Sequence, residues 1–427
     1  MADPPTKAPD LDRAPLDDPR LAELRQVGDP EADRLAARLL AEHPNLDERH
    51  LVRLVLDELR ADGNGNDGLV RDWLFEGPPL PEWADRKLIE RGQDFFGDWP
   101  LPIAAALFCV ALPGAYAAAD GSRVLTMTSD LATKDLSRRA VETGQMLFDV
   151  MDLGGRSPAP LEPDGPGYLT IRGIRLLHGV VRQNLLSLDS ASLNPDAPAL
   201  SWSPLWGCPV NQEDLLGTLL TFGVVVLHGL DRLGIPYDRC AAEAYVHTWC
   251  VIGDLIGIQP DLLPFDREEG ERLARLIAER HHRRSEDGRR LTAALLDYME
   301  LSMPLGFRKL PCTLMQHMLP APTPELLDVP RAAWWHPAIG VMARAGPWLD
   351  RIPGGRTLVQ VPTSLLGRAV LRAVVDRTLD GAQPAFRLDP KVVARLSLRT
   401  SRVRRTLRRR RRRIRRVRRV RRIQVER

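Results

Sequence analysis

Cysteines and aromatic residues are both scarce in this chain of 427 residues. The 5 cysteines are an odd number, lie far apart and include no C-x-x-C pair, while aromatic residues make up 5% of the sequence. This pattern excludes a disulfide framework and disfavours a zinc knuckle or an iron–sulfur cluster. Alternation of apolar and polar residues, which is typical of strands, is also scarce. The sequence therefore predicts an all-α fold with reduced thiols.

Several signals of function and location are also missing. No G-x-S-x-G, Walker or G-x-G-x-x-G pattern stands in a suitable context, so serine hydrolases, NTPases and Rossmann enzymes gain no support. The first twenty residues are polar, Pro-rich and acidic, unlike a secretory signal. The most apolar window, 101–119, is Ala-rich and contains Pro113, which favours a buried helix over a membrane span. We therefore expect a cytoplasmic protein.

The net charge of +4 conceals a strong asymmetry. Residues 395–427 contain eighteen arginines and one acid, Glu426, which gives this tail +17 and leaves −13 for the rest of the chain. A block of like charges favours a solvated, disordered polycation. Alternatively, Val403, Leu407 and Ile414 begin a rough apolar stripe, and an anionic membrane or nucleic acid would then fold the tail into a basic amphipathic helix.

Four regions follow from these patterns. Residues 1–30 are expected to form a disordered leader, residues 31–68 a helical segment with a linker, residues 69–390 one large helical domain, and residues 391–427 the Arg-rich tail. Apolar residues recur at helical spacing with breakers between them, and Asn211 is expected to cap one helix. The predicted helices cover residues 30–60, 129–155, 168–186, 211–234, 238–258, 267–284 and 289–303.

The helix expected over 171–186 contains one histidine on its apolar stripe. His178 shares that stripe with Ile174 and Val181, and Arg172 and Arg182 are near it in the sequence. A core histidine with a satisfied ring is one interpretation. An axial ligand to haem iron is the other, because one neutral imidazole suffices for haem whereas zinc needs several ligands. Arginines beside such a ligand would suit the haem propionates, since guanidinium groups pair with carboxylates in bidentate fashion.

The preceding predicted helix contains "SRRAVETGQMLFDVM". Arg139 and Thr143 are one helical turn apart, on a face that continues towards Met146 and Val150. A surface arginine and a neutral threonine are one interpretation. The other places a cation and a hydroxyl over a pocket, where they would polarise dioxygen.

Several stretches together resemble the family of rubber oxygenases (latex-clearing proteins) and MpaB-like oxygenases. They are "NQEDLLGTLLTFGVVVLHGLDRLGI", "EAYVHTWCVIGDLIGI", "RLLHGVVR" and the R-x-x-x-T from Arg139 to Thr143, in an order and spacing that span about residues 70–320. The resemblance implies a globin-reminiscent helical fold, haem b (iron) held by one histidine, here His178, and a distal Arg and Thr, here Arg139 and Thr143. Members of the family cleave isoprenoid C=C bonds with dioxygen.

Two departures from the family's rubber-cleaving members affect the expected substrate. Those members have a lysine directly before the threonine, where this chain has Glu142, and they are usually secreted. We therefore expect a haem b-dependent oxygenase of a small apolar, isoprenoid or lipid-like substrate, with Arg139 and Thr143 catalytic and Arg172 and Arg182 binding the cofactor. The alternative is a non-catalytic haem-binding or helical interaction protein, tethered to anionic surfaces by its tail.

Overall fold

The computed structural model describes residues 16–43, 46, 48–60, 67–128, 136–153, 157, 159–187, 202–331, 335–352, 354–361, 363–365 and 367. Within these ranges the chain is helical, and its β-structure is one isolated bridge between Ala118 and His282. The prediction of an all-α fold is confirmed. The α-helices are α1 (Asp18–Leu24), α2 (Pro30–Glu42), α3 (Glu48–Arg60), α4 (Gly68–Phe75), α5 (Arg86–Asp98), α6 (Pro100–Ala106), α7 (Leu112–Ala117), α8 (Ala119–Thr128), α9 (Leu136–Val150), α10 (Pro166–Ser187), α11 (Gln212–Leu220), α12 (Val226–Arg232), α13 (Arg239–Leu255), α14 (Arg267–His281), α15 (Glu286–Ser302), α16 (Leu310–Met318), α17 (Thr323–Leu326) and α18 (His336–Asp350). The shorter turns are the π-helical η1 (Leu107–Ala111) and η3 (Thr221–Val225) and the 3₁₀ turns η2 (Pro204–Trp206), η4 (Pro260–Leu262) and η5 (Leu305–Phe307).

Short polar side chains begin many of these helices. The predicted cap at Asn211 is confirmed, because its Oδ1 accepts a hydrogen bond from the Asp214 N–H at 2.9 Å. Asp266 and Ser285 do the same for α14 and α15. Each cap satisfies an N–H that has no partner inside its helix. These local signals explain why the predicted starts of α11, α13 and α14 lie within one residue of the observed ones, whereas the helix expected from residue 289 begins at Glu286.

Two predicted boundaries differ from the structure. The periodic stretch 30–60 forms two helices, because α2 ends at Glu42 and α3 begins at Glu48. The helix expected over 129–155 appears as α9 from Leu136, and the cap expected at Ser129 and Asp130 lies outside the described residues. Periodicity alone did not distinguish one long helix from two helices on the same side of a neighbour.

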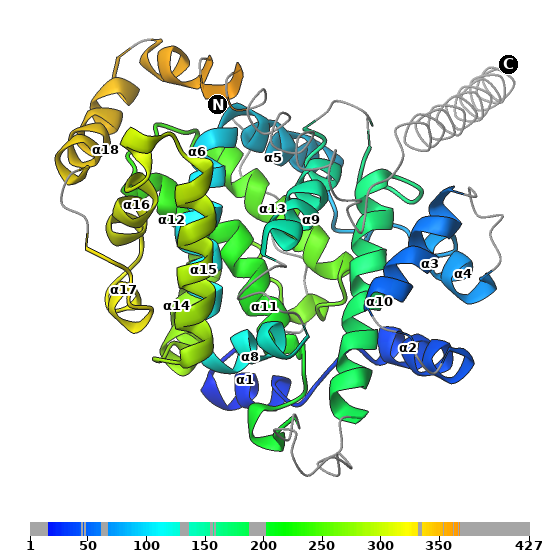
Figure 1. Ribbon diagram of the computed structural model, residues 1–427. Helices are drawn as coiled ribbons and strands as arrows, with labels where there is room; N and C mark the ends of the chain where they lie inside the picture. Colours follow the sequence, from blue (N-terminus) through cyan, green and yellow to red (C-terminus); the bar gives the residue numbers. More distant parts are fainter. Residues whose placement is uncertain are drawn as a thin grey trace, which may run out of the picture.

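The long helix α10 lies between two layers of the molecule (Figure 1). On one side it packs against α2, α3 and α4, and on the other against α9 and α13. Gly179 permits a close crossing with α2, since a Cβ there would lie 2.9 Å from the Ala32 carbonyl oxygen. The inner side of α10 therefore faces the main bundle, while its outer side is covered by the N-terminal helices.

Two apolar segments run through the centre of the bundle, α6–η1–α7 and α11–η3–α12. Their π-helical turns pack against each other. The spans Pro100–Ala117 and Gln212–Arg232 are long and apolar enough to cross a membrane, yet 61% of each apolar window is buried inside the protein. They serve as core helices, as expected for 101–119, and the described residues offer no clear transmembrane span.

The leader expected to be disordered over 1–30 is ordered where the structure describes it. Helix α1 buries Leu21 and Leu24, and the Arg25 Nη1 lies 3.0 Å from the Asp214 Oδ1. Apolar burial and this ion pair together stabilise docking of α1 against α11, which explains why the Pro-rich, acidic composition was misleading here.

A buried charge cluster holds this docked segment, and Glu213 is at its centre. Glu213 is fully buried; its Oε1 accepts from the Arg280 Nε at 2.7 Å and lies 2.8 Å from the His281 Nε2. Burial by itself would raise the pKa of Glu213, but the hydrogen bonds from His281 and Arg280 outweigh it and lower the pKa. Arg280 also pairs with Asp18, so α14 is tied to α1.

Candidate functional site

His178 lies in α10 three residues after Arg175 and four before Arg182, so it is close to their face of the helix. Ile171 and Leu185 are seven residues before and after it, so the three side chains share one face of the helix. Ile171 and Leu185 are buried and His178 is half-buried. The predicted stripe members Ile174 and Val181 are half-buried, as His178 is, and the role of His178 stays a prediction.

The N-terminal helix α2 binds the arginines on either side of His178. Arg175 donates from Nε to the Asp29 Oδ2 at 2.5 Å and from Nη2 to the Glu31 Oε2 at 2.8 Å. Arg182 pairs with Asp33. The carboxylates of one helix thus fix two cations, each one helical turn from the histidine.

Arg182 is fully committed to the protein. It is 1% exposed, and besides its ion pair it donates from Nε to the Pro209 carbonyl at 2.9 Å and from Nη2 to the Val210 carbonyl at 2.7 Å. These bonds fasten the segment before α11 to α10. A role for Arg182 with haem propionates stays a prediction, and it would require a ligand to share these donors.

Arg172 is buried in a different way. It is 2% exposed, its Nε donates to the Trp73 carbonyl at 2.6 Å, and its Cζ lies 4.1 Å from the centre of the Trp73 ring. Burial lowers the pKa of Arg172, because no carboxylate among the described residues lies within ion-pair distance to offset it. Arg172 and Arg175 line a cavity of about 380 Å³ together with the acidic residues Asp29, Glu31 and Asp254. Arg172 is thus a buried cation with carboxylates near it but outside ion-pair distance.

Helices α9 and α10 run in opposite directions from a polar contact near their junction (Figure 1). The Thr170 Oγ1 donates to the Asp149 Oδ2 at 3.0 Å, and Gln145 donates to the other oxygen of the same carboxylate at 2.9 Å. His178 follows Thr170 by eight residues, and Thr143 precedes Asp149 by six, so both lie about 9 to 12 Å along their helices from this contact. Thr143 is half-buried, and its position relative to His178 stays a prediction.

Arg139 lies one turn before Thr143 in α9. Its backbone belongs to the helix, but its side chain is outside what the structure describes. The predicted shared face of Arg139 and Thr143 follows from the helical spacing, and the orientation of Arg139 stays a prediction.

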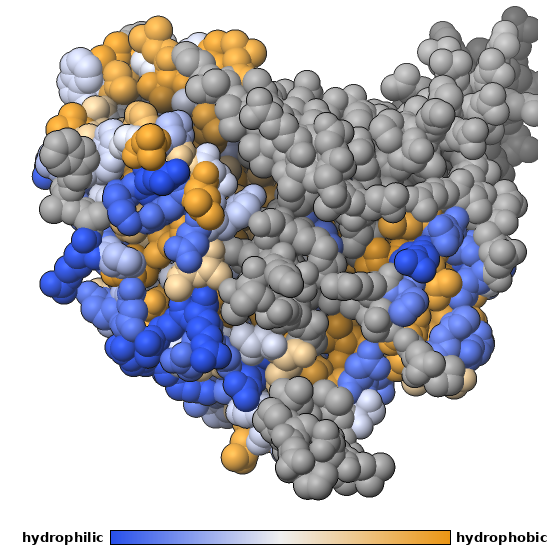
Figure 2. Space-filling model, in the orientation of Figure 1, coloured by the Kyte–Doolittle hydropathy of each residue, from blue (hydrophilic) through white to orange (hydrophobic). Residues whose placement is uncertain are grey.

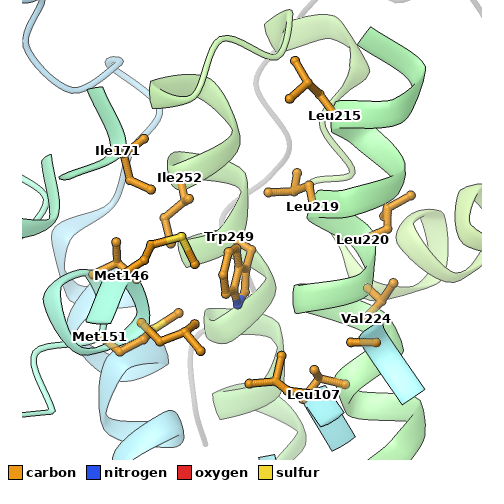
Figure 3. Packing of buried hydrophobic residues seen from close by; sticks show 14 of the residues in the cluster. Leu107, Met146, Met151, Ile171, Leu215, Leu219, Leu220, Val224, Trp249 and Ile252 are labelled. Carbon is orange, nitrogen blue, oxygen red and sulfur yellow. The ribbon is translucent and has the colours of Figure 1, made fainter. Parts of the chain in front are cut away.

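An apolar cluster occupies the space between α9, α10, α11 and α13 (Figure 3). Met146 of α9, Ile171 of α10, Ile252 of α13 and Leu219 of α11 surround Trp249. The Trp249 Nε1 is buried and finds no acceptor among the described residues. A buried indole N–H without an acceptor is unusual in a protein core.

The π-helical turn η3 helps to hold the indole in place. Phe222 of η3 stacks on Trp249 with ring centres 5.0 Å apart, and the Tyr245 hydroxyl donates to the Phe222 carbonyl at 2.8 Å. A π turn disturbs the regular ladder of helix hydrogen bonds, so this hydroxyl satisfies a displaced carbonyl. Such turns occur frequently at functional sites.

His228 and His247 also lie on apolar helices, where each could be a core residue or line a pocket. The His247 Nε2 accepts from the Asp85 N–H at 3.0 Å, and burial lowers the pKa of His247 to about 4. It is a core residue that holds the start of α5. The His228 Nε2 is buried without a partner among the described residues, and burial also lowers the pKa of His228.

Some residues of this region had not been singled out from the sequence. Asp29, Asp33 and Trp249 are far from His178 in the chain, and no short motif joins them to it. The stretch "DPEADR" is typical of the acidic first turn of a helix, but only the fold shows that this helix contacts α10. The described residues contain no group of three or more His, Cys, Asp or Glu side chains that would hold a metal ion.

A solved protein structure has the same fold. The structure of latex clearing protein in its closed state superposes with a TM-score of 0.61 at 19% sequence identity, covering 82% of this chain and 91% of that one. A likeness at this identity establishes the fold. It places the chain in a class of helical proteins whose long central helices surround an apolar interior.

The sequence then defines the family within that class. The family model "ER-bound oxygenase mpaB/B'/Rubber oxygenase, catalytic domain" matches residues 94–423, which is more than half of the chain. The chain belongs to this family and contains its oxygenase catalytic domain, which confirms the predicted family and enzyme class. The match begins within α5 and extends into the Arg-rich tail.

A curated relative agrees with this assignment. The rubber oxygenase of Streptomyces sp. (strain K30) is 24% identical over 241 residues, which are 54% of this chain and 53% of the relative. The matched region thus spans about half the length of that relative. Helices α1–α4, including the carboxylates that pair with Arg175 and Arg182, precede the family match.

Proposed function

We propose that this chain is a haem b-dependent oxygenase that acts with dioxygen on a small apolar substrate of isoprenoid or lipid-like character. Its membership of the oxygenase family supports the reaction class. The observation that carries the proposal for this chain is the position of His178, half-buried on the face of α10 that continues from Ile171 into the apolar cluster.

The residues of this region suit haem b. A single imidazole at the edge of an apolar interior matches the needs of an axial iron ligand. The buried, unsatisfied Trp249 N–H and the surrounding Met, Ile and Leu side chains match an apolar macrocycle with a few polar atoms. His178 would hold the iron, and haem, when bound, would supply the activation of dioxygen.

The two arginines proposed to bind the cofactor differ in what they offer. Arg172 lines a cavity and lacks an ion-pair partner among the described residues, so a propionate could pair with it. Arg182 already donates to Asp33, Pro209 and Val210. We therefore propose Arg172 as the principal propionate contact, with Arg182 adding positive charge near His178.

Arg139 and Thr143 are proposed as the catalytic pair. Their one-turn spacing on α9 and the antiparallel register of α9 with α10 support a position facing the His178 level. A guanidinium and a hydroxyl fixed there would stabilise negative charge that develops on dioxygen during the reaction. The neighbouring Glu142 replaces the lysine of rubber-cleaving members, which supports a substrate other than polymeric rubber.

Haem binding is tested by His178→Gly. We expect the purified wild type to show a Soret band, the variant to lose it, and added imidazole to restore it by occupying the space of the missing ring. His336→Gly, at the exposed start of α18, is the control and should bind haem as the wild type does. An unchanged Soret band and unchanged ligation in His178→Gly would falsify the assignment of the ligand.

Turnover is tested separately by dioxygen uptake with short isoprenoids and unsaturated lipids. Uptake coupled to carbonyl products supports the oxygenase. A protein that binds haem through His178 but consumes no dioxygen with any of these substrates is the non-catalytic haem protein of the alternative.

A further inference from the structure

Helix α18 turns an apolar side towards the solvent. Val341 and Trp348 are seven residues apart, so they share one face, and they are 64% and 62% exposed. Ile339, on the opposite face, is 4% exposed and packs into the core. Surface helices of soluble proteins normally turn polar residues outward. Helix α18 is therefore apolar on both faces, and within the described part of the chain its outer face is exposed.

The next helical stretch repeats this arrangement. Residues 355–361 and 363–365 are helical, and Leu358, Val361 and Leu365 follow the spacing i, i+3 and i+7 on one face. Leu358 and Leu365 are 74% and 68% exposed. Two consecutive helical stretches thus have an outward apolar stripe, which a single exposed leucine would not signify.

These side chains gather on one part of the surface. Figure 2 shows hydrophobic residues concentrated at the upper left, where Figure 1 places α18 and the stretch after it. Phe307 stacks on Trp335, the residue before α18, with ring centres 5.2 Å apart, and the exposed Leu305 adjoins it. We call Leu305, Phe307, Val341, Trp348, Leu358 and Leu365 the outer apolar face.

Positive charge borders the outer apolar face. Residues 331–367 contain four arginines and one acid, and Arg344 and Arg351 are exposed beside Trp348. The Arg-rich tail of +17 follows in the sequence. Tryptophan at an interface, aliphatic side chains below it and arginines around it suit the boundary between lipid headgroups and acyl chains.

Charge also argues against other occupants. A second copy of the chain on this face would bring like-charged arginines and tails together, which opposes association. A nucleic acid would satisfy the arginines but would leave the aliphatic stripes in water. We propose that the outer apolar face is a docking surface for an anionic lipid membrane, into whose interface Trp348, Leu358 and Leu365 insert.

The test measures binding of the full-length chain to sedimenting vesicles, with and without phosphatidylglycerol in phosphatidylcholine. The variant Trp348→Ser/Leu358→Ser/Leu365→Ser removes three exposed apolar side chains. The control, Leu186→Ser/Leu205→Ser, removes exposed leucines from α10 and η2. Binding is measured at low salt and at about 1 M salt, where the screening length is roughly 3 Å and attraction of the tail is largely suppressed.

We expect the wild type and the control to bind anionic vesicles at both salt concentrations. The triple variant should bind at least about tenfold more weakly at high salt, while the tail preserves part of its binding at low salt. Brominated lipids should quench more tryptophan fluorescence in the wild type than in Trp348→Phe. Because none of these readouts requires haem or turnover, their failure and failure of the oxygenase assignment are independent.

Three results would overturn the proposal. In the first, the triple variant binds vesicles as the wild type does at both salt concentrations. In the second, the wild type forms dimers that the triple variant does not, which assigns the face to a second copy. In the third, the triple variant melts several degrees lower with unchanged vesicle binding, which shows that another part of the chain covers the face.

Discussion

Single charged residues differ widely in what their removal should cost, because their burial differs. Asp33 pairs with Arg182, which is 1% exposed, whereas Asp72 pairs with an Arg71 that is well exposed. A buried cation that loses its carboxylate keeps its charge in a poorly solvated place. An exposed cation regains water. The same chemical change therefore probes two environments.

We predict that Asp33→Asn lowers the free energy of unfolding by about 3 to 5 kcal/mol, because it leaves the Arg182 guanidinium buried with carbonyl partners alone. Urea unfolding at neutral pH measures the change. Asp72→Asn is the matched control and should leave the unfolding midpoint unchanged. Equal effects of the two substitutions would contradict the buried pair.

His247 should make the fold sensitive to acid. Burial lowers its pKa from 6.5 to about 4 in the folded protein, and its neutral Nε2 accepts from the Asp85 N–H. Below about pH 6.5 the unfolded chain binds the proton more readily, so the stabilisation is present above that pH and is lost as the pH falls towards 4. The loss amounts to about 3 kcal/mol.

The variant His247→Gln keeps an acceptor but does not titrate. We predict that the loss of stability between pH 7 and pH 4.5, measured by urea unfolding, is smaller in this variant by about 2 kcal/mol. The exposed His336→Gln should lose as much stability as the wild type does. The same acid response in His247→Gln and wild type would show that other groups govern it.

Arg139 is predicted to act in the reaction and not in cofactor retention. Arg139→Ala should keep a normal Soret band and lower kcat by roughly 10²- to 10³-fold, the loss expected when one preorganised donor is removed. Arg138→Ala changes the adjacent residue on a different side of α9 and should retain most activity. If both substitutions reduce turnover equally, the predicted face of α9 is wrong.

The crossing of α2 over α10 has little room for change. At Gly179 a Cβ would meet the Ala32 carbonyl oxygen at 2.9 Å, and this contact involves backbone that cannot rotate away. Gly114 of α7 has no heavy atom within 4 Å of its added Cβ. Substitution by alanine is therefore expected to have opposite effects on stability at these two helical glycines.

We predict that Gly179→Ala destabilises the protein by about 1 to 3 kcal/mol, because the helices must separate to admit the methyl group. Gly114→Ala should be neutral or should stabilise by up to about 1 kcal/mol, since alanine is the better helix former. Urea midpoints compare the two. A stabilising Gly179→Ala would mean that the crossing is looser than described.

Helices themselves could be predicted from the sequence because their causes are local. The cap at Asn211, the apolar repeat from Ile171 to Leu185 and the stop near Gly234 all lie within a few residues of what they determine. Partners of site residues could not be predicted in this way. Asp29 and Arg175 are 146 residues apart, and no local sequence pattern at either residue indicates the other as its partner. Likewise, the lack of an acceptor for the buried Trp249 N–H depends on the packing of four helices and could not be predicted from the sequence.

At the scale of the whole molecule, the basic tail can bind either the acidic body of the same chain or an external anionic surface. We predict that truncation after Pro390 leaves the fold and haem binding intact, removes most low-salt binding to nucleic acid and weakens low-salt binding to anionic vesicles. Each arginine near an anionic membrane contributes about 1 kcal/mol before screening, so eighteen of them should favour a dense external surface over the −13 body. Binding isotherms at several salt concentrations measure the effect, and equally weak binding of both forms at low salt would refute the tether.

The ion pair between Asp18 and Arg280 joins positions 262 residues apart in the sequence, whereas Asp29 and Arg175 are separated by 146. A ribosome adds roughly 5 to 20 residues per second, so Arg280 is made about 10 to 50 s after Asp18. Helix α2 therefore has a partner well before α1 does. A chain whose synthesis stops between α11 and α14 therefore contains the helix against which α1 docks but lacks the ion pair that ties α1 to α14.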